Sequence, residues 1–418
     1  MNKNPIMKHI FYYFQIKTIS PLSIGNGADE KTDNDLLMDD KGKPFIPGTS
    51  IAGVISRFTP INIELDRNEY KQSPVYVSDA RVPKDTTVHT DIRDGVSLDD
   101  HRIAKDGSKY DFEVVRTNTP FDFRIEIVVR KNDNVNMKKG IDEFICYLCN
   151  GDVTFGGKTT RGYGSVKLEK VFCREFTQDN LEEYLKFNPY MLEAYNGYEI
   201  PLNQYNLDSS KYHILNVHMK QNGGLIIRKY TTQPGDVDYE QIRLDDTTAL
   251  IPGTSWAGLL RKQFHFYNQQ ITDNNDIEKK WFGDVDTTTG TAHKSKIIIK
   301  ESMLVDGLFK DVARNKIDRF TGGTVDTALF EERPYYNGET TLTIAVPKED
   351  GADYILGLFV LFILKDLRNG FIALGGEVSI GRGLFDFSAE DISIDNKAIN
   401  EEYYRKAVKA YVSKEVNA

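Results

Sequence analysis

The chain has 418 residues, more than one hydrophobic core usually supports, so we expect two domains. Its 40% hydrophobic and 11% aromatic residues are typical of a globular protein and exclude a low-complexity or disordered chain. The formal net charge of -9 argues against a protein that attracts nucleic acid with its entire surface, although a local basic groove is compatible with it.

The sequence also lacks the usual signs of export. No run approaches the roughly 20 apolar residues that span a bilayer, and the polar, aromatic N-terminal segment is unlike a signal peptide, so we expect a cytoplasmic protein without a membrane partner. Cys146, Cys149 and Cys173 are too few for a disulfide framework. One CxxC pair cannot close a four-ligand zinc site, so we expect buried core thiols and no zinc.

The first half of the chain predicts a β-α-β-α-β series. Residues 9–19 alternate as a half-buried strand does. FIPGTSIAG (residues 45–53) follows, where a proline opens a helix, a Thr or Ser can cap it, and small residues allow tight packing on a sheet. A second strand (residues 123–130) and a helix (residues 141–149) lead to the glycine-rich segment FGGKTTRGYGSV, which begins at Phe155.

The second half repeats these landmarks in the same order. LIPGTSWAG begins at Leu250, and Ile251 follows Ile46 at an offset of 205 (251 - 46). LGGEVSIGRGLF begins at Leu374, and Gly375 follows Gly156 at an offset of 219 (375 - 156). Alternating strands and an apolar helix again fill the space between them. An ordered internal repeat of this kind indicates duplication of one domain.

The order of elements predicts an α+β chain made of two tandem ferredoxin-like, or RNA-recognition-motif-like, domains with insertions. We place the first domain at residues 1–175, a connector at 176–210, the second domain at 211–395 and a C-terminal amphipathic helix at 396–418.

Two repeated motifs offer sites for a sugar-phosphate backbone. The start of each IPGTS helix presents backbone N–H groups and hydroxyls to an anion. Glycines in the later loop let a backbone approach another chain closely. The alternative is that both motifs are tight turns packed on their own sheet. The residues predicted to bind RNA here are Gly48, Thr49, Ser50 and Arg57, Gly253, Thr254, Ser255 and Arg261, Gly156, Gly157, Lys158, Arg161 and Gly162, and Gly375, Gly376 and Arg382.

Taken together, these motifs resemble the RAMP superfamily of CRISPR proteins, and within it the backbone subunits of type III complexes of the Csm and Cmr kind. The resemblance rests on both IPGTS elements, on GGxxxRGYG (intact from Gly156, degraded from Gly375) and on NKIDRFTGGT at residues 315–324. It implies binding to a CRISPR guide RNA, a target RNA and other subunits of the complex. Ile380 replaces Arg161 in the second copy, where Arg382 is the nearest substitute.

Two pairs of arginines share one spacing. The positions of Arg102 and Arg116 differ by 14 (116 - 102), and so do those of Arg319 and Arg333 (333 - 319). A constant offset of 217 (319 - 102 and 333 - 116) therefore pairs Arg102 with Arg319 and Arg116 with Arg333. The shared spacing favours a common role, such as contact with phosphate. In the resembling proteins the segment that they flank is a thumb-like hairpin, which pushes a base out of the guide–target duplex. The alternative is four ordinary surface arginines.

The resemblance also implies cleavage of target RNA by an aspartate that precedes the IPG element, with a divalent metal such as Mg or Mn. Asp33 and Asp238 precede the isoleucine of that element at the same offset of 13 (46 - 33 and 251 - 238), and Asp35 and Asp236 are close rivals. A displaced base aligns its own 2′-hydroxyl for attack, so one carboxylate suffices. The alternatives are a non-cutting scaffold and a metal-free, histidine-dependent ribonuclease that processes the guide.

Overall fold

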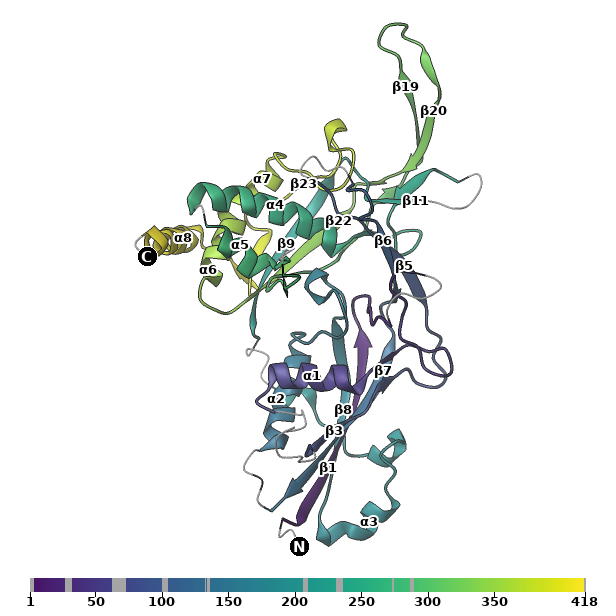
Figure 1. The fold of residues 1–418 in the computed structure, drawn as a ribbon, viewed down its shortest axis with the longest axis vertical. Coiled ribbons are helices and arrows are strands. Elements are labelled where there is room, and N and C mark those ends of the chain that lie inside the picture. The colour runs from purple at the N-terminus through teal and green to yellow at the C-terminus, as the bar shows by residue number, and fades with distance from the viewer. Residues whose placement is uncertain are drawn as a thin grey trace. The chain divides into compact units, whose positions relative to one another are not determined.

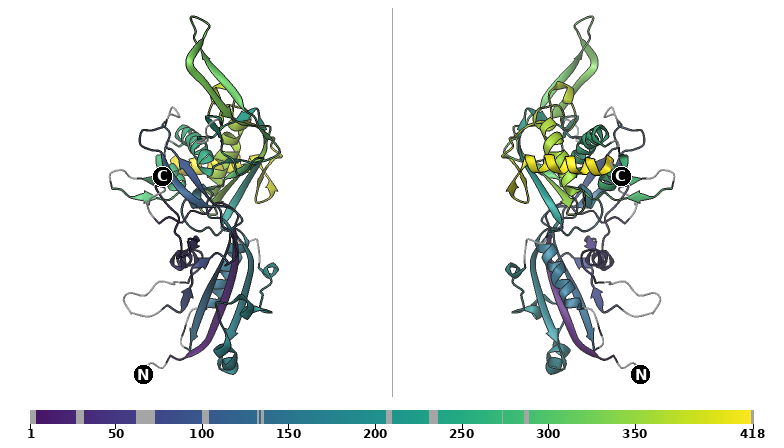
Figure 2. Two further views of the ribbon diagram at one scale, coloured as in Figure 1. Left: turned by 90° about the vertical axis from the view of Figure 1, so that its right-hand side faces the viewer. Right: turned by 90° about the vertical axis from the view of Figure 1, so that its left-hand side faces the viewer.

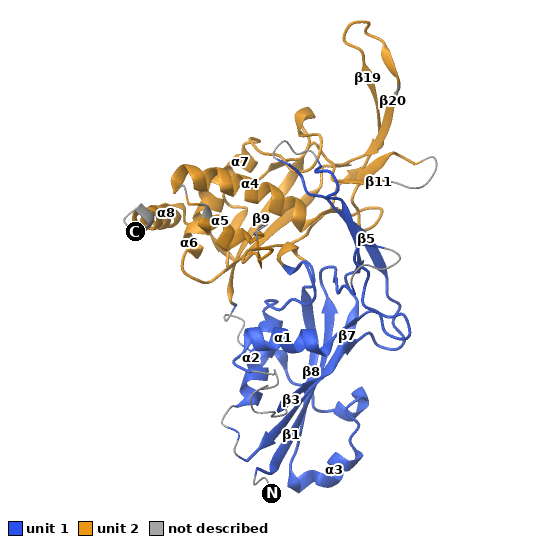
Figure 3. Cartoon of the chain, viewed as in Figure 1, with its two compact units in different colours: residues 1–159, 163–210 blue, residues 160–162, 211–418 orange. Residues whose placement is uncertain are grey.

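The computed structural model describes residues 4–26, 32–61, 73–99, 104–131, 133, 136–205, 210–230, 236–272, 274–285 and 289–416. The chain divides into two compact units (Figure 3). Unit 1 comprises residues 1–159 and 163–210, and unit 2 comprises residues 160–162 and 211–418. The segment predicted as a connector, residues 176–210, therefore clusters with unit 1.

Unit 1 is an antiparallel sheet with two helices on one face. Its central strand β1 (Ile6–Thr18) pairs with β7 (Pro120–Arg130) on one side and β8 (Val166–Phe176) on the other. The remaining strands, β2 (Phe45–Ile46), β3 (Val75–Val77) and β4 (Ala80–Arg81), continue the sheet beyond β7. With α1 (Gly48–Phe58) and α2 (Met137–Cys149), this is the predicted ferredoxin-like arrangement (Figure 1).

The first strand is apolar on both faces, and each face has its own partner. Its even-numbered side chains Ile10, Tyr12, Phe14 and Ile16 join the core beneath the helices. Its odd-numbered Phe11 and Tyr13 lie on the opposite face. There they pack with Phe172 and Phe176 of β8 against a segment that contains α3 (Leu181–Lys186) and the 3-10 turn Leu192–Tyr195. The apolar run IFYYF is therefore buried on both faces of the strand.

Unit 2 repeats the same strand order. Its central strand β9 (Tyr212–Asn222) pairs with β22 (Glu339–Pro347), which pairs in turn with β16 (Ile298–Ile299). On its other side β9 pairs with β23 (Leu384–Asp386) and β24 (Ile392–Ile394), and β24 pairs with β25 (Lys397–Ala398). The helices are α4 (Gly253–Ile271), α5 (Asn275–Phe282), and α6 (Ala352–Leu358), which continues through a π-helical turn into α7 (Leu364–Arg368).

Each unit carries a long hairpin ahead of the strand that pairs with its central strand, β7 in unit 1 and β22 in unit 2. In unit 1 it is β5 (Thr90–Gly95) with β6 (Tyr110–Val115). In unit 2 it is β19 (Val312–Ile317) with β20 (Thr324–Arg333), which extends away from the body of the unit (Figure 1). The short strands that complete unit 2 are β10 (Gly224–Leu225), β11 (Arg228–Tyr230), β12 (Tyr239–Gln241), β13 (Ala249–Ile251), β14 (Asp284–Val285), β15 (Ala292–His293), β17 (Ser302–Leu304), β18 (Leu308–Phe309) and β21 (Tyr335–Tyr336).

The C-terminal helix α8 (Glu401–Val416) begins later than predicted, because β25 precedes it. It is the yellow helix in Figure 2. Tyr404 and Val408 belong to the buried core of unit 2, and the ring of Tyr411 stacks on Tyr354 of α6 with their centres 4.3 Å apart. The helix is therefore part of the unit 2 core.

All three cysteines are free thiols, and they are half-buried rather than fully buried as expected. Burial raises the pKa of Cys173 to about 11, which keeps it protonated near neutral pH. Within the described residues, no group of three or more His, Cys, Asp or Glu side chains is arranged to hold a metal ion. None of the described helices has the length and apolar content needed to span a membrane.

Candidate functional site

Helices α1 and α4 begin at the glycine of each IPGTS element, after a proline in the N-cap position. No side chain caps either helix, so the predicted Thr or Ser cap is wrong. The N–H of Gly48 instead donates to Asp79 Oδ1 at 3.0 Å. A Cβ at Gly48 would collide with the carbonyl oxygen of Val77, and one at Gly253 would collide with that of Ile299. These glycines allow close packing within each unit, and Asp79 already occupies the anion position predicted at Gly48.

The outer faces of the same helices are matched. In α1 the exposed residues of one stripe are Thr49, Gly53 and Arg57, and in α4 they are Thr254, Gly258 and Lys262. Ser50 and Ser255 are half-buried. Lys262, and not the predicted Arg261, corresponds to Arg57, because the two share the offset of 205 of the IPGTS elements (262 - 57). A four-residue helical spacing is the signal that finds it.

Arg261, which the sequence predicted to bind RNA, points to a neighbouring helix. Its Nε donates to Glu278 Oε1 of α5 at 2.7 Å, and the pair is partly buried. Arg261 therefore links α4 to α5, while the exposed basic residue of this helix is Lys262.

The glycine-rich loops turn back on their own units. Gly156 and Gly375 have φ angles of +78° and +81°. The following amides, Gly157 and Gly376, donate to the carbonyl oxygens of Ser23 and Ile226 at 2.7 and 2.8 Å. These two N–H groups are satisfied internally, so in this respect the loops are tight turns packed on their own sheet.

The later part of the first loop differs between the copies. Arg161 is half-buried at the end of the 3-10 turn Thr159–Arg161, and residues 160–162, which include Gly162 with a φ of +88°, cluster with unit 2 (Figure 3). In the second copy the matching turn, Val378–Ile380, ends on an exposed isoleucine. That loop carries no charge at the position of Arg161.

Lys158 of the first loop lies over two aromatic rings of the unit 1 hairpin. Its Nζ is 4.4 Å from the ring centre of Tyr110 and 4.3 Å from that of Phe112, both on β6. Phe112 in turn meets the edge of Tyr163, with ring centres 5.7 Å apart. Cation–π and aromatic contacts thus attach this loop to strand β6 of the hairpin.

Ionic groups occupy the same three positions in unit 2: Glu377 matches Lys158, Glu332 matches Phe112, and Arg382 matches Tyr163. The guanidinium of Arg382, 5% exposed, bonds Glu332 and lies 2.7 Å from Glu377. Arg314 of β19 contacts both carboxylates, at 2.7 and 3.1 Å. Arg382 is therefore an internal counter-ion, and we remove it from the predicted RNA surface.

Burial raises the pKa of Glu332, which is fully buried. Burial alone would also raise the pKa of Glu377, but its hydrogen bond with Glu332 and the charges of Arg382 and Arg314 lower it. The two carboxylates thus differ in proton affinity although they share one set of arginines. We refer to Glu332, Glu377, Arg382 and Arg314 as the unit 2 ion network.

The two arginines at the hairpin bases form ion pairs within their units. Arg116 Nη2 lies 2.6 Å from Asp91 Oδ1, a hydrogen bond that raises the pKa of the guanidinium. Arg333 lies 2.6 Å from Asp311 and 2.9 Å from Asp236, and the pKa of its guanidinium is raised by these partners, Asp311 first. Both side chains brace the structure around the hairpin.

The predicted equivalence of these arginines is wrong by three positions. Val115 exchanges backbone hydrogen bonds with Leu22, and Tyr335 pairs in the same way with Leu225. Val115 and Tyr335 therefore occupy the same position, at an offset of 220 (335 - 115). Arg333 corresponds to Glu113, and the equal spacing of the arginine pairs does not reflect equal placement.

The tip of the unit 2 hairpin is apolar and basic. Phe320 is 98% exposed in the turn, and Ile317 and Leu329 are also largely exposed on the hairpin strands. Asp318 orders the turn by accepting the N–H groups of Phe320 and Thr321. Arg319 is exposed beside Phe320. Its predicted counterpart Arg102 lies outside the described residues.

Asp33 and Asp238, the predicted catalytic residues, have matching positions. Asp33 is exposed, and its Oδ2 accepts the N–H of Asp111 on β6 at 3.0 Å. Asp238 is exposed, and its Oδ2 accepts the N–H of Glu331 on β20 at 2.9 Å. Asp111 and Glu331 are equivalent at the same offset as Val115 and Tyr335. In both units the return strand of the hairpin therefore holds the loop aspartate.

The rival aspartates have other roles. Asp35 is buried and accepts both the N–H and the hydroxyl of Thr32, at 2.9 and 2.6 Å. Asp236 accepts the N–H of Val237, which lowers its pKa, and pairs with Arg333. Both carboxylates shape the loop, whereas Asp33 and Asp238 are exposed.

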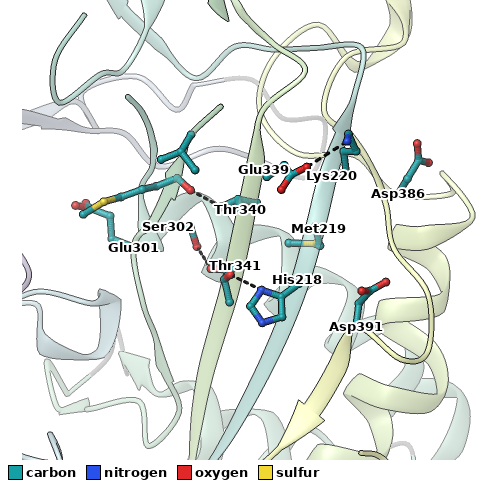
Figure 4. A pocket seen from close by; sticks show the side chains of 12 residues that line it. His218, Met219, Lys220, Glu301, Ser302, Glu339, Thr340, Thr341, Asp386 and Asp391 are labelled. Atoms are coloured by element: carbon teal, nitrogen blue, oxygen red, sulfur yellow. Dashed lines mark hydrogen bonds and ion pairs between the residues drawn. The ribbon is translucent and has the colours of Figure 1, made fainter. Parts of the chain in front are cut away.

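A cavity of about 510 Å³ lies in unit 2 on strands β9, β17 and β22. Figure 4 shows His218 hydrogen-bonded to Thr341 and Lys220 paired with Glu339, with Asp386 beside Lys220 and Asp391 beside His218. None of the predicted site residues lines it. Its acidic lining is unlike a site for RNA phosphates.

No curated protein matches the chain. The family model described as the RAMP superfamily matches it over residues 15–167 and 210–386, one match in each unit. These matches cover well over half of the chain and agree with the two ferredoxin-like units and with the order of their motifs. The chain therefore belongs to the RAMP superfamily, with two copies of the family's RNA-binding, CRISPR-associated module in tandem.

Proposed function

We propose that this chain is a guide-RNA-binding backbone subunit of a type III CRISPR interference complex, and that it cleaves the target RNA paired with the guide. The observation that carries the proposal is the equivalence of Asp33 and Asp238. Each is an exposed carboxylate, and each is held by the return strand of a projecting hairpin. Duplication of this arrangement gives the chain two potential cutting positions on one target.

The hairpins supply the second part of the proposal. Phe320 presents a fully exposed ring beside the exposed cation of Arg319, a combination that suits stacking on a base next to a phosphate. The unit 1 hairpin exposes Ile92 and Tyr110. An apolar side chain that enters a duplex separates neighbouring bases, which is the distortion that in-line cleavage requires. Each hairpin would thus prepare the phosphodiester that its loop aspartate faces.

The chemistry is a transesterification within the RNA. The 2′-oxygen of the displaced nucleotide attacks the adjacent phosphorus, the P–O5′ bond breaks, and the products are a 2′,3′-cyclic phosphate and a 5′-hydroxyl. The proton of the 2′-hydroxyl passes to a carboxylate or to water, and the leaving oxygen takes a proton from water.

Asp33 and Asp238 also suit a divalent metal completed by RNA. Mg²⁺ often binds one or two protein carboxylates together with phosphate oxygens and waters, so a three-ligand protein cluster is not required. Each aspartate uses Oδ2 for a backbone N–H and is exposed to solvent. Such an ion would stabilise the charge that develops on the phosphate.

The alternative is a scaffold that holds guide RNA without cutting it. This alternative needs neither Asp33 nor Asp238, and it is favoured by the described residues, among which no group of three or more His, Cys, Asp or Glu side chains could hold a metal ion. A guide-processing ribonuclease is less well supported. His9 Nδ1 and His213 Nδ1 are hydrogen-bonded to the carboxylates of Glu126 and Asp395 at 2.9 and 2.8 Å, so both rings are engaged within their own units.

One reconstitution separates these functions. The complex is assembled with guide RNA and end-labelled complementary target, and cleavage is followed with and without chelator for wild type, Asp33→Ala, Asp238→Ala and the double variant. We expect two metal-dependent cuts, both absent from the double variant. Target binding without any cut supports the scaffold function. Cutting of repeat RNA that a chelator does not inhibit supports guide processing. Failure to bind guide RNA rules out all three functions.

A further inference from the structure

The two loop aspartates are held differently, although their positions match. In unit 1, the backbone N–H of Asp33 donates to the side-chain Oδ1 of Asp111 at 2.9 Å, and the N–H of Asp111 returns a bond to Asp33 Oδ2. In unit 2, the N–H of Asp238 donates to the backbone carbonyl oxygen of Glu331 at 2.9 Å. The backbone N–H of the loop aspartate therefore bonds a side chain in unit 1 and a backbone carbonyl oxygen in unit 2.

We infer that Asp111 is a positioning residue for cleavage by unit 1, and this inference rests on the proposed function. Asp33 is exposed, although its neighbours Thr32, Asp35 and Leu36 are buried. Two further hydrogen bonds of the described residues join this loop to β6: the Asn34 carbonyl oxygen accepts the N–H of Glu113, and the Leu36 N–H donates to Glu113 Oε2. The two reciprocal bonds fix both the backbone and the carboxylate of Asp33 against β6. Since misplacement by about 1 Å can reduce a rate a hundredfold, this anchor decides how well the carboxylate meets its phosphodiester.

The role assigned to Asp111 is that of a hydrogen-bond acceptor, and its charge is not needed. Asparagine offers the same Oδ1 acceptor without the charge, so it should keep the N–H of Asp33 in place. Alanine removes the acceptor and leaves that N–H to water. A metal ligand would behave differently, because asparagine would not replace the negative charge. Aspartate, asparagine and alanine at this position therefore distinguish the two roles.

The unit 2 hairpin needs no such side chain, because the acceptor for Asp238 is a carbonyl oxygen that every residue carries. The prediction is consequently asymmetric within one molecule. Substitution at Asp111 changes the unit 1 cut alone, and the unit 2 cut in the same complex reports that folding, assembly and target binding are intact.

The test uses the complete complex under single-turnover conditions, with the cuts of unit 1 and unit 2 assigned by Asp33→Ala and Asp238→Ala. We expect Asp111→Ala to slow the unit 1 cut by up to about tenfold, the factor that one lost hydrogen bond supports, with unchanged target affinity. Asp111→Asn should restore the rate to within about twofold and leave the metal concentration for half-maximal cutting unchanged. Asp94→Ala, which removes a facing carboxylate from β5, is the matched control.

Three outcomes decide the inference. Loss of the unit 1 cut in Asp33→Ala together with an unaltered rate in Asp111→Ala overturns the positioning role. A slow Asp111→Asn variant that needs more metal also overturns it and makes Asp111 a metal ligand. If Asp33→Ala and Asp238→Ala leave every cut in place, the proposed function itself fails, which is a separate result.

Discussion

Removing the arginine at the centre of the unit 2 ion network should destabilise that unit. Arg382→Met leaves the buried carboxylate of Glu332 and the partly buried one of Glu377 with Arg314, whose guanidinium contacts both, and with Arg228, which lies 3.2 Å from Glu377. Breaking a buried ion pair by deleting one partner costs ~3–5 kcal/mol. Because Arg314 remains within 2.7 Å of Glu332, we expect the lower end, about 3 kcal/mol.

Unit 1 indicates how the stability lost in Arg382→Met can be recovered. Its equivalent positions hold Phe112 and Tyr163, whose rings pack against each other, with the cation of Lys158 over the Phe112 ring. The double variant Glu332→Phe with Arg382→Tyr copies that pair and leaves Glu377 with Arg314 and Arg228. Replacing a buried ion pair with packed apolar groups is often neutral or stabilising, so the double variant should regain most of the lost stability.

The chain provides a reporter for this experiment. It contains two tryptophans, Trp256 and Trp281, and both are fully buried in the core of unit 2. Urea unfolding followed by tryptophan fluorescence therefore monitors unit 2 alone, and the midpoint shift at constant slope gives the change in free energy. A loss below about 1 kcal/mol for Arg382→Met, or a double variant as unstable as the single one, would refute the reasoning.

Three further results are expected. Burial raises the pKa of Asp122 above its usual 3.8, so the stabilisation from its protonated form is complete below that pH and is lost as the pH rises through the folded-state pKa. Above pH ~4, wild-type unit 1 should therefore lose stability relative to Asp122→Asn. The loss should appear as faster hydrogen exchange in β1 and β7 of the wild type than in the variant. Gly383→Ala should cost more than ~2 kcal/mol, because its φ is +78° and a Cβ would strike the Leu374 carbonyl oxygen, whereas Gly381→Ala meets open space and should cost about 1 kcal/mol by the same fluorescence assay; equal losses would contradict this. Phe320→Ala should slow the unit 2 cut without lowering stability, and an equal effect of Phe371→Ala, another exposed ring of this unit, would count against the hairpin's role.

Much of the fold follows from local sequence pattern. The alternation of apolar residues around Tyr12 and around Val217 predicts a strand with one face buried against helices. The IPG sequence predicts a helix start, because proline fixes the backbone ahead of the helix. The repeat then transfers each assignment from one copy to the other. The repeat does not show where one copy carries extra residues. Unit 1 has three more residues between Val115 and Ile127 than unit 2 has between Tyr335 and Ile344. A constant offset therefore misplaced Arg333.

The candidate site depended on contacts that the sequence does not display. Whether a loop glycine faces RNA or its own chain is decided by Ser23, which lies far from Gly157 in the sequence and accepts its N–H. Whether an arginine is free is decided by acids on other elements, as with Arg261 and Glu278. Asp33 and Asp238 were identified as candidates because the family resemblance implies an aspartate before IPG and both lie at the same offset from its isoleucine. Their anchors on β6 and β20 were not, because hairpin and loop meet only in the folded unit.

The most direct test of the account maps target cleavage to single nucleotides in complexes that carry Asp33→Ala or Asp238→Ala. We expect each substitution to remove one cut and leave the other, because each unit holds its own aspartate against its own hairpin. If both cuts persist in the double variant, or if one substitution removes both while the target still binds, the assignment of one cutting site to each unit is contradicted.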